Sequence, residues 1–338
     1  MTFLSSLFSA FPTNKVDQED IIKFSKKIFS LNQNFKKMLN VYKNSGVKTR
    51  FLVEELEWYK SKHFWKESNL AFKKHAINLI QICVEKTLKH SKKRPDQIGA
   101  IVVINTTGIS TPSLDVELFN VFNFKNTIKR LPLFGYGCAG GVLGMNRAVE
   151  LYEHIKEPVL VCNVELCSLT FRPHIFSKEN IVSTALFGDG ACSYLIDKTG
   201  DCKIEDSIDY TWKNSTELMG WGVEDDGFSV IFDKSIPDFI NKNLYNIVKP
   251  LIKNKNTGYI LHPGGMKIIN AYKKIFNNHE SINISQEALS EFGNVSSTSV
   301  LLVLAKILER KMSGQFLLSG LGPGFSAGVT KVSLDYAN

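Results

Sequence analysis

The sequence predicts an α/β fold in which buried sheets are covered by helices. Three observations lead to this prediction. Short continuous apolar runs such as GAIVVIN (99–105) and EPVLVCNV (157–164) are typical of strands buried on both faces. Segments with helical periodicity separate these runs in both halves of the chain. The 338 residues, 43% of them hydrophobic, are enough for two domains or one large duplicated domain.

The first half of the chain is expected to alternate strands and helices. Its opening, MTFLSSLFSAFP, has no basic residue before the apolar run, so we interpret it as a folded strand or arm rather than a secretion signal. Apolar periodicity predicts helices over 20–44, 70–91, 115–122 and 144–155. Short apolar runs predict strands over 99–105, 132–136, 157–164 and 191–196.

The second half repeats this alternation. Strands are predicted over 257–261 and 315–319, and helices over 238–248, 266–276 and 296–311. The breaks Pro263-Gly264-Gly265 and Gly293-Asn294 precede two of these helices. We therefore expect two halves, residues 1–200 and 201–338, which a duplicated α/β/α/β/α arrangement of five layers would accommodate.

Charge and cysteine usage narrow the class of protein. The net charge is +8, but no basic stripe is interleaved with aromatic residues, so we expect no nucleic acid partner. A positive surface of this kind suits small polyanions such as nucleotide-bearing thioesters. The absence of an 18-residue apolar run predicts no membrane span. The six cysteines form no C-x-x-C pair, which favours reduced thiols in the cytoplasm and no metal site.

One cysteine lies in a setting that suits chemistry. Cys138, in LPLFGYGCAGG, follows a short apolar run and precedes a helix. A helix N-terminus stabilises the thiolate that a thioester-attacking cysteine needs. The neighbouring glycines permit close approach of a substrate. Taken alone, the motif favours a packed thiol beside a tightly packed helix over a catalytic cysteine.

Two further residues lie at similar junctions. His262, in YILHPGG, either caps a strand end or pairs with a thiolate and donates a hydrogen bond to an enolate oxygen. Asn294, in EFGNVSST, either caps a helix or supplies an amide donor to the same oxygen. Together with Cys138 they suit carbon–carbon bond formation on thioesters, in which the cysteine carries the acyl group and decarboxylation of a malonyl thioester generates the enolate.

Six segments resemble the type III polyketide synthases, the chalcone and stilbene synthase superfamily. In chain order they are GYGCAGG, ELCSLTFR, ALFGDGA, ILHPGG, SEFGNVSS and GLGPG. The resemblance implies a thiolase-like fold and a homodimer that uses acyl-CoA and malonyl-CoA directly, without a further cofactor. It implies Cys138 as the nucleophile, with His262 and Asn294 as its partners in decarboxylation.

The resemblance also implies a substrate-binding set. Phe187 would stand where the coenzyme A tunnel meets the cavity, which Gly320 to Gly324 would support. Val230 replaces a second gatekeeping phenylalanine of the plant enzymes, and Cys167 replaces a frequent threonine. These differences favour a long fatty acyl starter and alkylpyrone or alkylresorcinol-type products. The remaining expected substrate contacts are Thr170, Gly264, Gly265 and Ser296. The candidates for coenzyme A phosphate binding, or for ordinary solvated charges, are Lys36, Lys37, Lys48 and Arg50.

Other functions remain open at this point. A third-class ketoacyl carrier-protein synthase, which performs a single condensation, also uses Cys, His and Asn. Its histidine is typically followed by Gln-Ala-Asn, whereas Pro-Gly-Gly follows His262 here. A biosynthetic thiolase would need a second cysteine near the C-terminus, but the last one is Cys202. A thiolase-fold protein that only binds acyl groups would be expected to have lost part of the Cys-His-Asn set.

Overall fold

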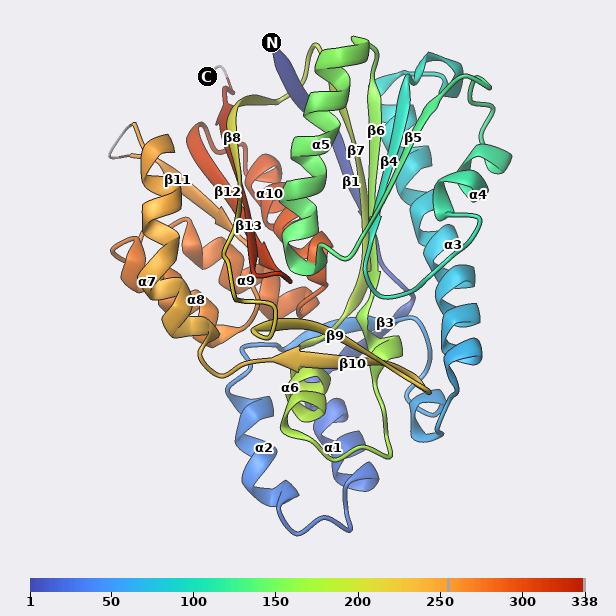
Figure 1. The fold of residues 1–338 in the computed structure, drawn as a ribbon, viewed down its shortest axis with the longest axis vertical. Helices are drawn as coiled ribbons and strands as arrows, with labels where there is room; N and C mark the ends of the chain where they lie inside the picture. Colours follow the sequence, from blue (N-terminus) through green and yellow to red (C-terminus); the bar gives the residue numbers. More distant parts are fainter. Residues whose placement is uncertain (254–255, 337–338) are drawn as a thin grey trace.

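A nine-stranded sheet runs through the molecule (Figure 1). The computed structural model describes residues 1–253 and 256–336. Within them the strand order is β11-β12-β13-β8-β1-β7-β6-β4-β5. The strands of this sheet are β1 (Thr2–Ala10), β4 (Ala100–Asn105), β5 (Lys129–Phe134), β6 (Val159–Leu166), β7 (Asp189–Asp197), β8 (Cys202–Thr211), β11 (Gly258–Leu261), β12 (Gly314–Gly322) and β13 (Ser326–Leu334).

The N-terminal segment is a central strand of this sheet. β1 pairs antiparallel with β7 on one side and with β8 on the other. It therefore joins the strands of the first half of the chain to those of the second half. The prediction of a folded strand at the N-terminus is confirmed.

Helices cover both outer faces and fill the middle. They are α1 (Gln18–Ile28), α2 (Phe35–Lys43), α3 (Trp65–Ser91), α4 (Leu114–Val121), α5 (Gly140–Ile155), α6 (Lys178–Leu186), α7 (Ile236–Val248), α8 (Met266–Ile275), α9 (Ile282–Phe292) and α10 (Ser299–Glu309). In Figure 1, α5 lies between the two groups of strands, with α3 on one side and α7 and α8 on the other.

The buried side chains reveal the layers. On β4, Ile101 and Val103 pack into the cluster that contains α3, whereas Val102 and Ile104 pack into the cluster that contains α5 and α10. The strands of the second half behave in the same way, with one face toward α5 and α10 and the other toward α7 and α8. Because successive side chains of a strand point to opposite faces, both groups of strands are buried on both sides. The predicted five-layered α/β/α/β/α arrangement is confirmed.

Two predicted elements differ from the structure. The helix expected over 20–44 is two helices, because Asn32 accepts a hydrogen bond from the backbone N–H of Asn34 at 3.0 Å and closes a turn between α1 and α2. The GLGPG segment is expected to follow its strand as a loop, but β12 continues to Gly322.

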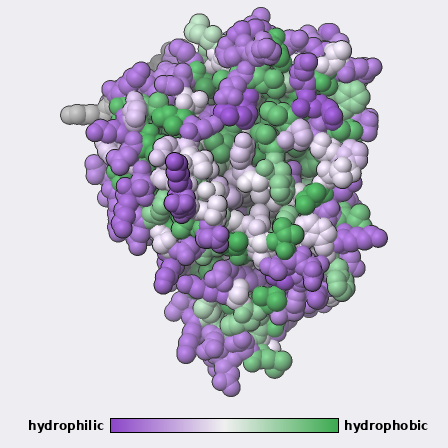
Figure 2. Space-filling view, viewed as in Figure 1, coloured by the Kyte–Doolittle hydropathy of each residue, from purple (hydrophilic) through white to green (hydrophobic). Residues whose placement is uncertain are grey.

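Two smaller sheets lie apart from the main sheet. One pairs β2 (Asn14–Asp17) with β3 (Thr49–Leu52), and the other pairs β9 (Met219–Glu224) with β10 (Gly227–Phe232). Together with α1, α2 and α6 they form the lower part of the molecule in Figure 1. Figure 2 shows apolar side chains reaching the surface in the middle and lower parts of this face, within a mainly hydrophilic rim. No helix of residues 1–253 and 256–336 has the length and apolarity that a membrane crossing requires.

Candidate active site

Cys138, His262 and Asn294 line one cleft of about 360 Å³. Each comes from a different junction. Cys138 lies in a 3-10 turn, Gly137–Ala139, directly before α5. His262 follows β11, and Asn294 lies between α9 and the short turn Ser296–Thr298. The structure thus brings together the three residues that the sequence analysis singled out.

Glycines hold the Cys138 turn against its neighbours. Gly137 has a φ of +49°, and a Cβ there would lie 2.6 Å from Cδ of Pro323. A Cβ at Gly141 would lie 2.2 Å from the carbonyl oxygen of Ser297. These contacts leave no room for a side chain. The glycines around Cys138 therefore allow three backbone segments to pack together.

The GLGPG segment supports the same turn from behind. A Cβ at Gly320 would lie 2.9 Å from the carbonyl oxygen of Cys138, and one at Gly322 would lie 2.3 Å from that of Tyr136. The end of β12 is thus in direct backbone contact with the segment that carries the cysteine. This close packing gives a physical reason for small residues at these positions.

Backbone contacts orient Asn294 and His262. The Asn294 Oδ1 accepts a hydrogen bond from the Ser296 N–H at 2.9 Å, and its Nδ2 donates to the Gly264 carbonyl at 3.3 Å. The backbone N–H of His262 donates to the Ser319 carbonyl at 2.9 Å. A Cβ at Gly264 would lie 3.4 Å from the His262 Nε2. Gly264 is therefore adjacent to both side chains.

Burial favours the neutral forms of Cys138 and His262. Burial raises the pKa of Cys138 to about 12, although the Ser296 hydroxyl, whose Oγ lies 3.7 Å from Sγ and can donate a hydrogen bond to the thiolate, acts in the opposite direction. Burial lowers the pKa of His262 to about 3. The Nδ1 of His262 is buried without a hydrogen-bond partner. Without substrate, burial alone therefore keeps a thiol and a neutral imidazole in the cleft.

A buried carboxyl group lies beneath the site. Glu165 accepts hydrogen bonds from the Ser297 Oγ at 2.7 Å, the Thr106 N–H at 3.0 Å and the Thr107 Oγ1 at 3.0 Å. Burial raises its pKa to about 7, and its charge also raises the pKa of Cys138. The sequence analysis did not identify Glu165. The available signal was a lone acidic residue within a mainly apolar strand.

Phe187 belongs to an aromatic cluster beside the cleft. It follows α6 and forms a single β-bridge with Asn294. Its ring lies 6.0 Å from that of Trp221 and 5.8 Å from that of Phe232, measured between centroids. Phe232 lines the cleft. Both rings were missed from sequence, although Phe232 follows Val230 by two residues on the same strand and so shares its face.

Several predicted substrate contacts lie near the cleft rather than in its wall. Gly264 and Gly265 line the cleft. Cys167 and Thr170 line a smaller pocket of about 40 Å³, which they share with Phe187. Val230 lies in β10 opposite Trp221 and is not a lining residue of either space. Phe187 therefore lies at the edge of the smaller pocket, next to Leu186, which lines the cleft.

Arg50 does not fit the predicted role in coenzyme A binding. It is 1% exposed, and its guanidinium donates to the Gln18 side chain and to the carbonyls of Thr184 at 2.8 Å, Ala185 at 2.7 Å and Phe187 at 2.8 Å. Burial lowers its pKa to about 10. Arg50 therefore caps the end of α6 and holds the backbone of Phe187, which leaves it no access to a phosphate.

Exposed lysines lie in the lining of the cleft, at its mouth, and on the neighbouring helix α2. Lys36 and Lys37 are exposed on α2, one turn before the cleft residue Asn40, and Lys48 is exposed after α2. The exposed lysines that line the cleft itself are Lys178, Lys234 and Lys267, together with the acidic residues Glu179 and Asp233. The sequence analysis missed these three lysines, because they come from separate elements that meet only in the fold.

The chain is similar to known proteins along nearly its whole length. It matches the family "Chalcone and stilbene synthases, N-terminal domain" over residues 2–199 and the corresponding C-terminal domain over residues 207–334. A "Putative chalcone synthase" of Bacillus subtilis (strain 168) is 33% identical, with 97% of each chain covered. A "1,3,6,8-tetrahydroxynaphthalene synthase" of Streptomyces peucetius subsp. caesius is 28% identical and covers 96% of this chain and 91% of its own.

The fold is also that of a solved enzyme structure. The crystal structure of 1,3,6,8-tetrahydroxynaphthalene synthase from Streptomyces coelicolor A3(2), a bacterial type III polyketide synthase, superposes with a TM-score of 0.91. The alignment covers 99% of this chain and 100% of that chain at 22% sequence identity. This likeness supports the thiolase-like fold expected from the sequence motifs.

Proposed function

The chain belongs to the chalcone and stilbene synthase family, the type III polyketide synthases, and we propose that Cys138 takes an acyl starter from coenzyme A and that malonyl-CoA extends it by decarboxylative Claisen condensation. The observation that carries this proposal is the convergence of Cys138, His262 and Asn294 on one cleft. Residues 1–200 supply the nucleophile, and residues 201–338 supply the histidine and the asparagine.

Loading begins with a proton transfer. The Cys138 thiol gives its proton to the neutral His262 imidazole, and the thiolate attacks the carbonyl carbon of the acyl-CoA. A new carbon–sulfur bond forms, the bond to the coenzyme A sulfur breaks, and the imidazolium returns the proton to the departing coenzyme A thiolate. Charge separation is tolerable in the buried cleft because thiolate and imidazolium are formed together and partly cancel each other's field.

Extension uses the same two donors. The malonyl thioester loses carbon dioxide, and the electrons of the broken carbon–carbon bond form an enolate whose oxygen accepts hydrogen bonds from His262 and from the Asn294 amide. The nucleophilic carbon then attacks the acyl group on Cys138. A carbon–carbon bond forms, and the cysteine leaves as a thiolate. A neutral imidazole and an amide are suitable donors, since neither needs to change its protonation state.

The coenzyme A phosphates are assigned to the lysines at the mouth of the cleft. Lys178, Lys234 and Lys267 are exposed and line the same space as Cys138. They offer mobile cationic groups at the end where a bulky polar carrier has to remain while its acyl group reaches the thiol. Lys36 and Lys37 on the adjoining helix α2 would add to the positive potential.

For the starter we propose a long fatty acyl chain, with alkylpyrone or alkylresorcinol-type products. The lining of the cleft supports this choice, because its apolar part includes Leu186, Met219, Phe232, Ile240 and Leu321. A second candidate product is 1,3,6,8-tetrahydroxynaphthalene, which is favoured by the similarity to the Streptomyces peucetius protein named 1,3,6,8-tetrahydroxynaphthalene synthase. The two candidates differ in whether an apolar starter appears in the product.

The test is incubation of the protein with a panel of acyl-CoA starters and malonyl-CoA, followed by mass analysis of protein and products. We expect an acyl adduct on Cys138 and products that contain the starter plus several malonyl-derived units. Single-condensation products would favour the carrier-protein synthase class instead. Cys138→Ala should abolish the adduct, and Cys202→Ala, at a buried free cysteine outside the cleft, should not. An adduct that persists in Cys138→Ala contradicts the proposal.

We also propose that the protein is a homodimer. The edge strand β5 and its surroundings expose large apolar side chains, with Phe134 53%, Val121 52% and Ile109 44% accessible. An exposed strand edge with apolar residues beside it is a typical protein–protein contact. Sedimentation velocity should give a dimer that Phe134→Lys weakens. A wild-type monomer at micromolar concentration would refute this part of the proposal.

A further inference from the structure

The β9–β10 hairpin is held in place by side chains rather than by the main sheet. Its two strands pair only with each other within residues 1–253 and 256–336. The pairing runs from Gly227 opposite Glu224 to Phe232 opposite Met219. A hairpin of this length has little independent stability. Its position over the cleft therefore depends on the contacts that its side chains make with the rest of the molecule.

One face of the hairpin forms part of the site. Residues directly opposite each other on two strands share a face, so Trp221 and Val230 lie on the same side as Met219 and Phe232. Met219 and Phe232 line the cleft, and the rings of Trp221 and Phe232 contact Phe187. A displacement of the hairpin would consequently change the aromatic surroundings of Phe187.

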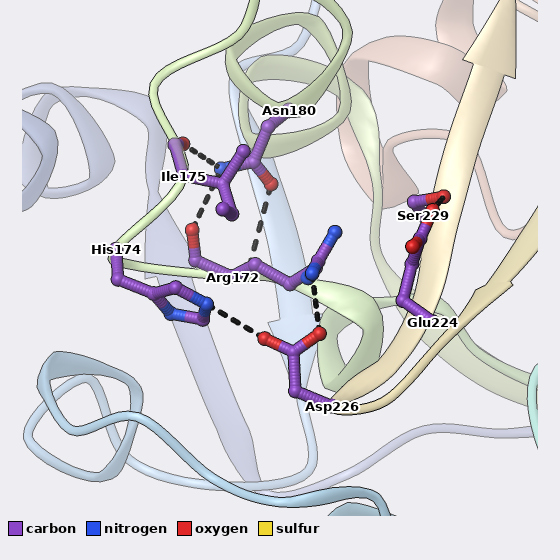
Figure 3. A network of polar contacts seen from close by, with 7 residues as sticks. All are labelled: Arg172, His174, Ile175, Asn180, Glu224, Asp226 and Ser229. Atoms are coloured by element: carbon purple, nitrogen blue, oxygen red, sulfur yellow. Dashed lines mark hydrogen bonds and ion pairs between the residues drawn. The ribbon is translucent and has the colours of Figure 1, made fainter.

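A partly buried ion cluster anchors the turn of the hairpin (Figure 3). Asp226 lies in the turn, and its carboxylate accepts from the guanidinium of Arg172 and lies 2.6 Å from the Nε2 of His174. The Asp226 side chain is only 7% exposed. Burial by itself would raise its pKa, but Arg172 and His174 hold the pKa below its ordinary value. The carboxylate therefore remains charged at neutral pH.

The anchor is also linked to α6, the helix that precedes Phe187. The side chain of Asn180, on α6, donates to the carbonyls of Arg172 at 2.8 Å and Ile175 at 2.7 Å. The segment that carries Arg172 and His174 is thereby tied to α6, the helix that Phe187 follows. Figure 3 also includes Ser229 and Glu224. The Ser229 hydroxyl donates to the Glu224 carboxylate at 2.8 Å, an exposed contact that joins the two strands of the hairpin to each other.

We propose that Asp226, held by Arg172 and His174, is a positioning residue that determines which acyl starters the enzyme accepts. It places Trp221 and Phe232 against Phe187, between the cleft and the small pocket beside Cys167. The closed aromatic cluster limits how far an acyl chain extends past Phe187. This inference rests on the proposed loading of acyl-CoA onto Cys138, and it concerns the length of the chain rather than the chemistry.

The test compares Asp226→Asn with Asp225→Asn. The second change removes the neighbouring, exposed carboxylate. For each variant, kcat/KM is measured with acyl-CoA starters of increasing length, together with the release of carbon dioxide from malonyl-CoA alone. We expect Asp226→Asn to change the ratio between long and short starters by about tenfold, the size of effect that reshaping an apolar pocket produces. Decarboxylation should stay within about twofold, because His262 and Asn294 keep their places.

Further variants separate positioning from simple loss of structure. Arg172→Lys and His174→Gln should shift the length profile in the same direction as Asp226→Asn, and Asp226→Glu should restore part of it. An unchanged profile in natively folded Asp226→Asn, or an equal change in Asp225→Asn, overturns the inference. Failure of the wild type to form any acyl adduct on Cys138 would instead refute the proposed function, so the two failures are distinguishable.

Discussion

The Cys138 turn and the β9–β10 hairpin border the same cleft but are held in place by different interactions. At the Cys138 turn, backbone meets backbone, and Gly141 and Gly322 have no room for a Cβ. At the hairpin, Gly220 has no atom within 4 Å of an added Cβ, and one ion cluster at Asp226 with a few ring contacts determines the position. The turn that carries the proposed nucleophile is thus fixed by main-chain packing, whereas the hairpin beside the cleft is held through side chains.

The largest expected effect concerns the donors beside the cysteine. His262→Ala and Asn294→Ala should each slow malonyl-CoA decarboxylation by about 100- to 1000-fold, the typical result of losing one oxyanion donor. Carbon dioxide release measures this step without acyl loading. Near-normal carbon dioxide release from either variant would mean that the substituted residue does not stabilise the enolate.

The two regions should also differ in their tolerance of a methyl group. Gly141→Ala places a Cβ 2.2 Å from the Ser297 carbonyl oxygen and should lower the free energy of unfolding by about 1–3 kcal/mol. The matched change in the hairpin, Gly220→Ala, should alter it by less than about 0.5 kcal/mol. Denaturant unfolding monitored by circular dichroism measures both. Equal effects would remove the distinction between the regions.

The pH dependence of Cys138 reactivity examines the coupling with His262. An imidazolium beside the sulfur favours the thiolate, so removal of His262 should raise the pKa of Cys138 above its wild-type value. The rate of alkylation by iodoacetamide should then inflect at higher pH in His262→Ala than in the wild type, with a lower rate at pH 7. Superimposable profiles would show that the two side chains are not coupled.

The smallest expected effect lies at the mouth of the cleft. Lys267→Ala should raise KM for malonyl-CoA several-fold with little change in kcat. The effect is small because an exposed ion pair contributes about 1 kcal/mol or less to the free energy of binding. Lys48→Ala, at an exposed lysine outside the cleft lining, is the matched control. A larger effect at Lys48 than at Lys267 would return the coenzyme A site to the segment first expected from the sequence.

The sequence predicted the three residues that meet in the cleft better than it predicted the residues around them. Cys138 and Asn294 each follow a glycine, and His262 precedes Pro263-Gly264-Gly265, all at strand or helix boundaries, a local pattern that is visible in the chain. Arg50 was misplaced, because the same basic side chain suits either a surface phosphate site or the buried carbonyls at the end of α6. Glu165, Trp221 and the lysines of the cleft mouth were missed, since their roles depend on partners far away in the chain.

By itself, the sequence determined the alternation of strands and helices, the apolar runs of the doubly buried strands, and the glycines that surround the cysteine. These features are encoded locally, by hydrophobic periodicity and by the absence of side chains. Only the tertiary structure decided that β1 joins the two halves, that Arg50 is buried, and that Asp226 holds the hairpin against Phe187. Such contacts join residues distant in sequence, and their energies depend on burial and geometry that arise only when the chain has folded.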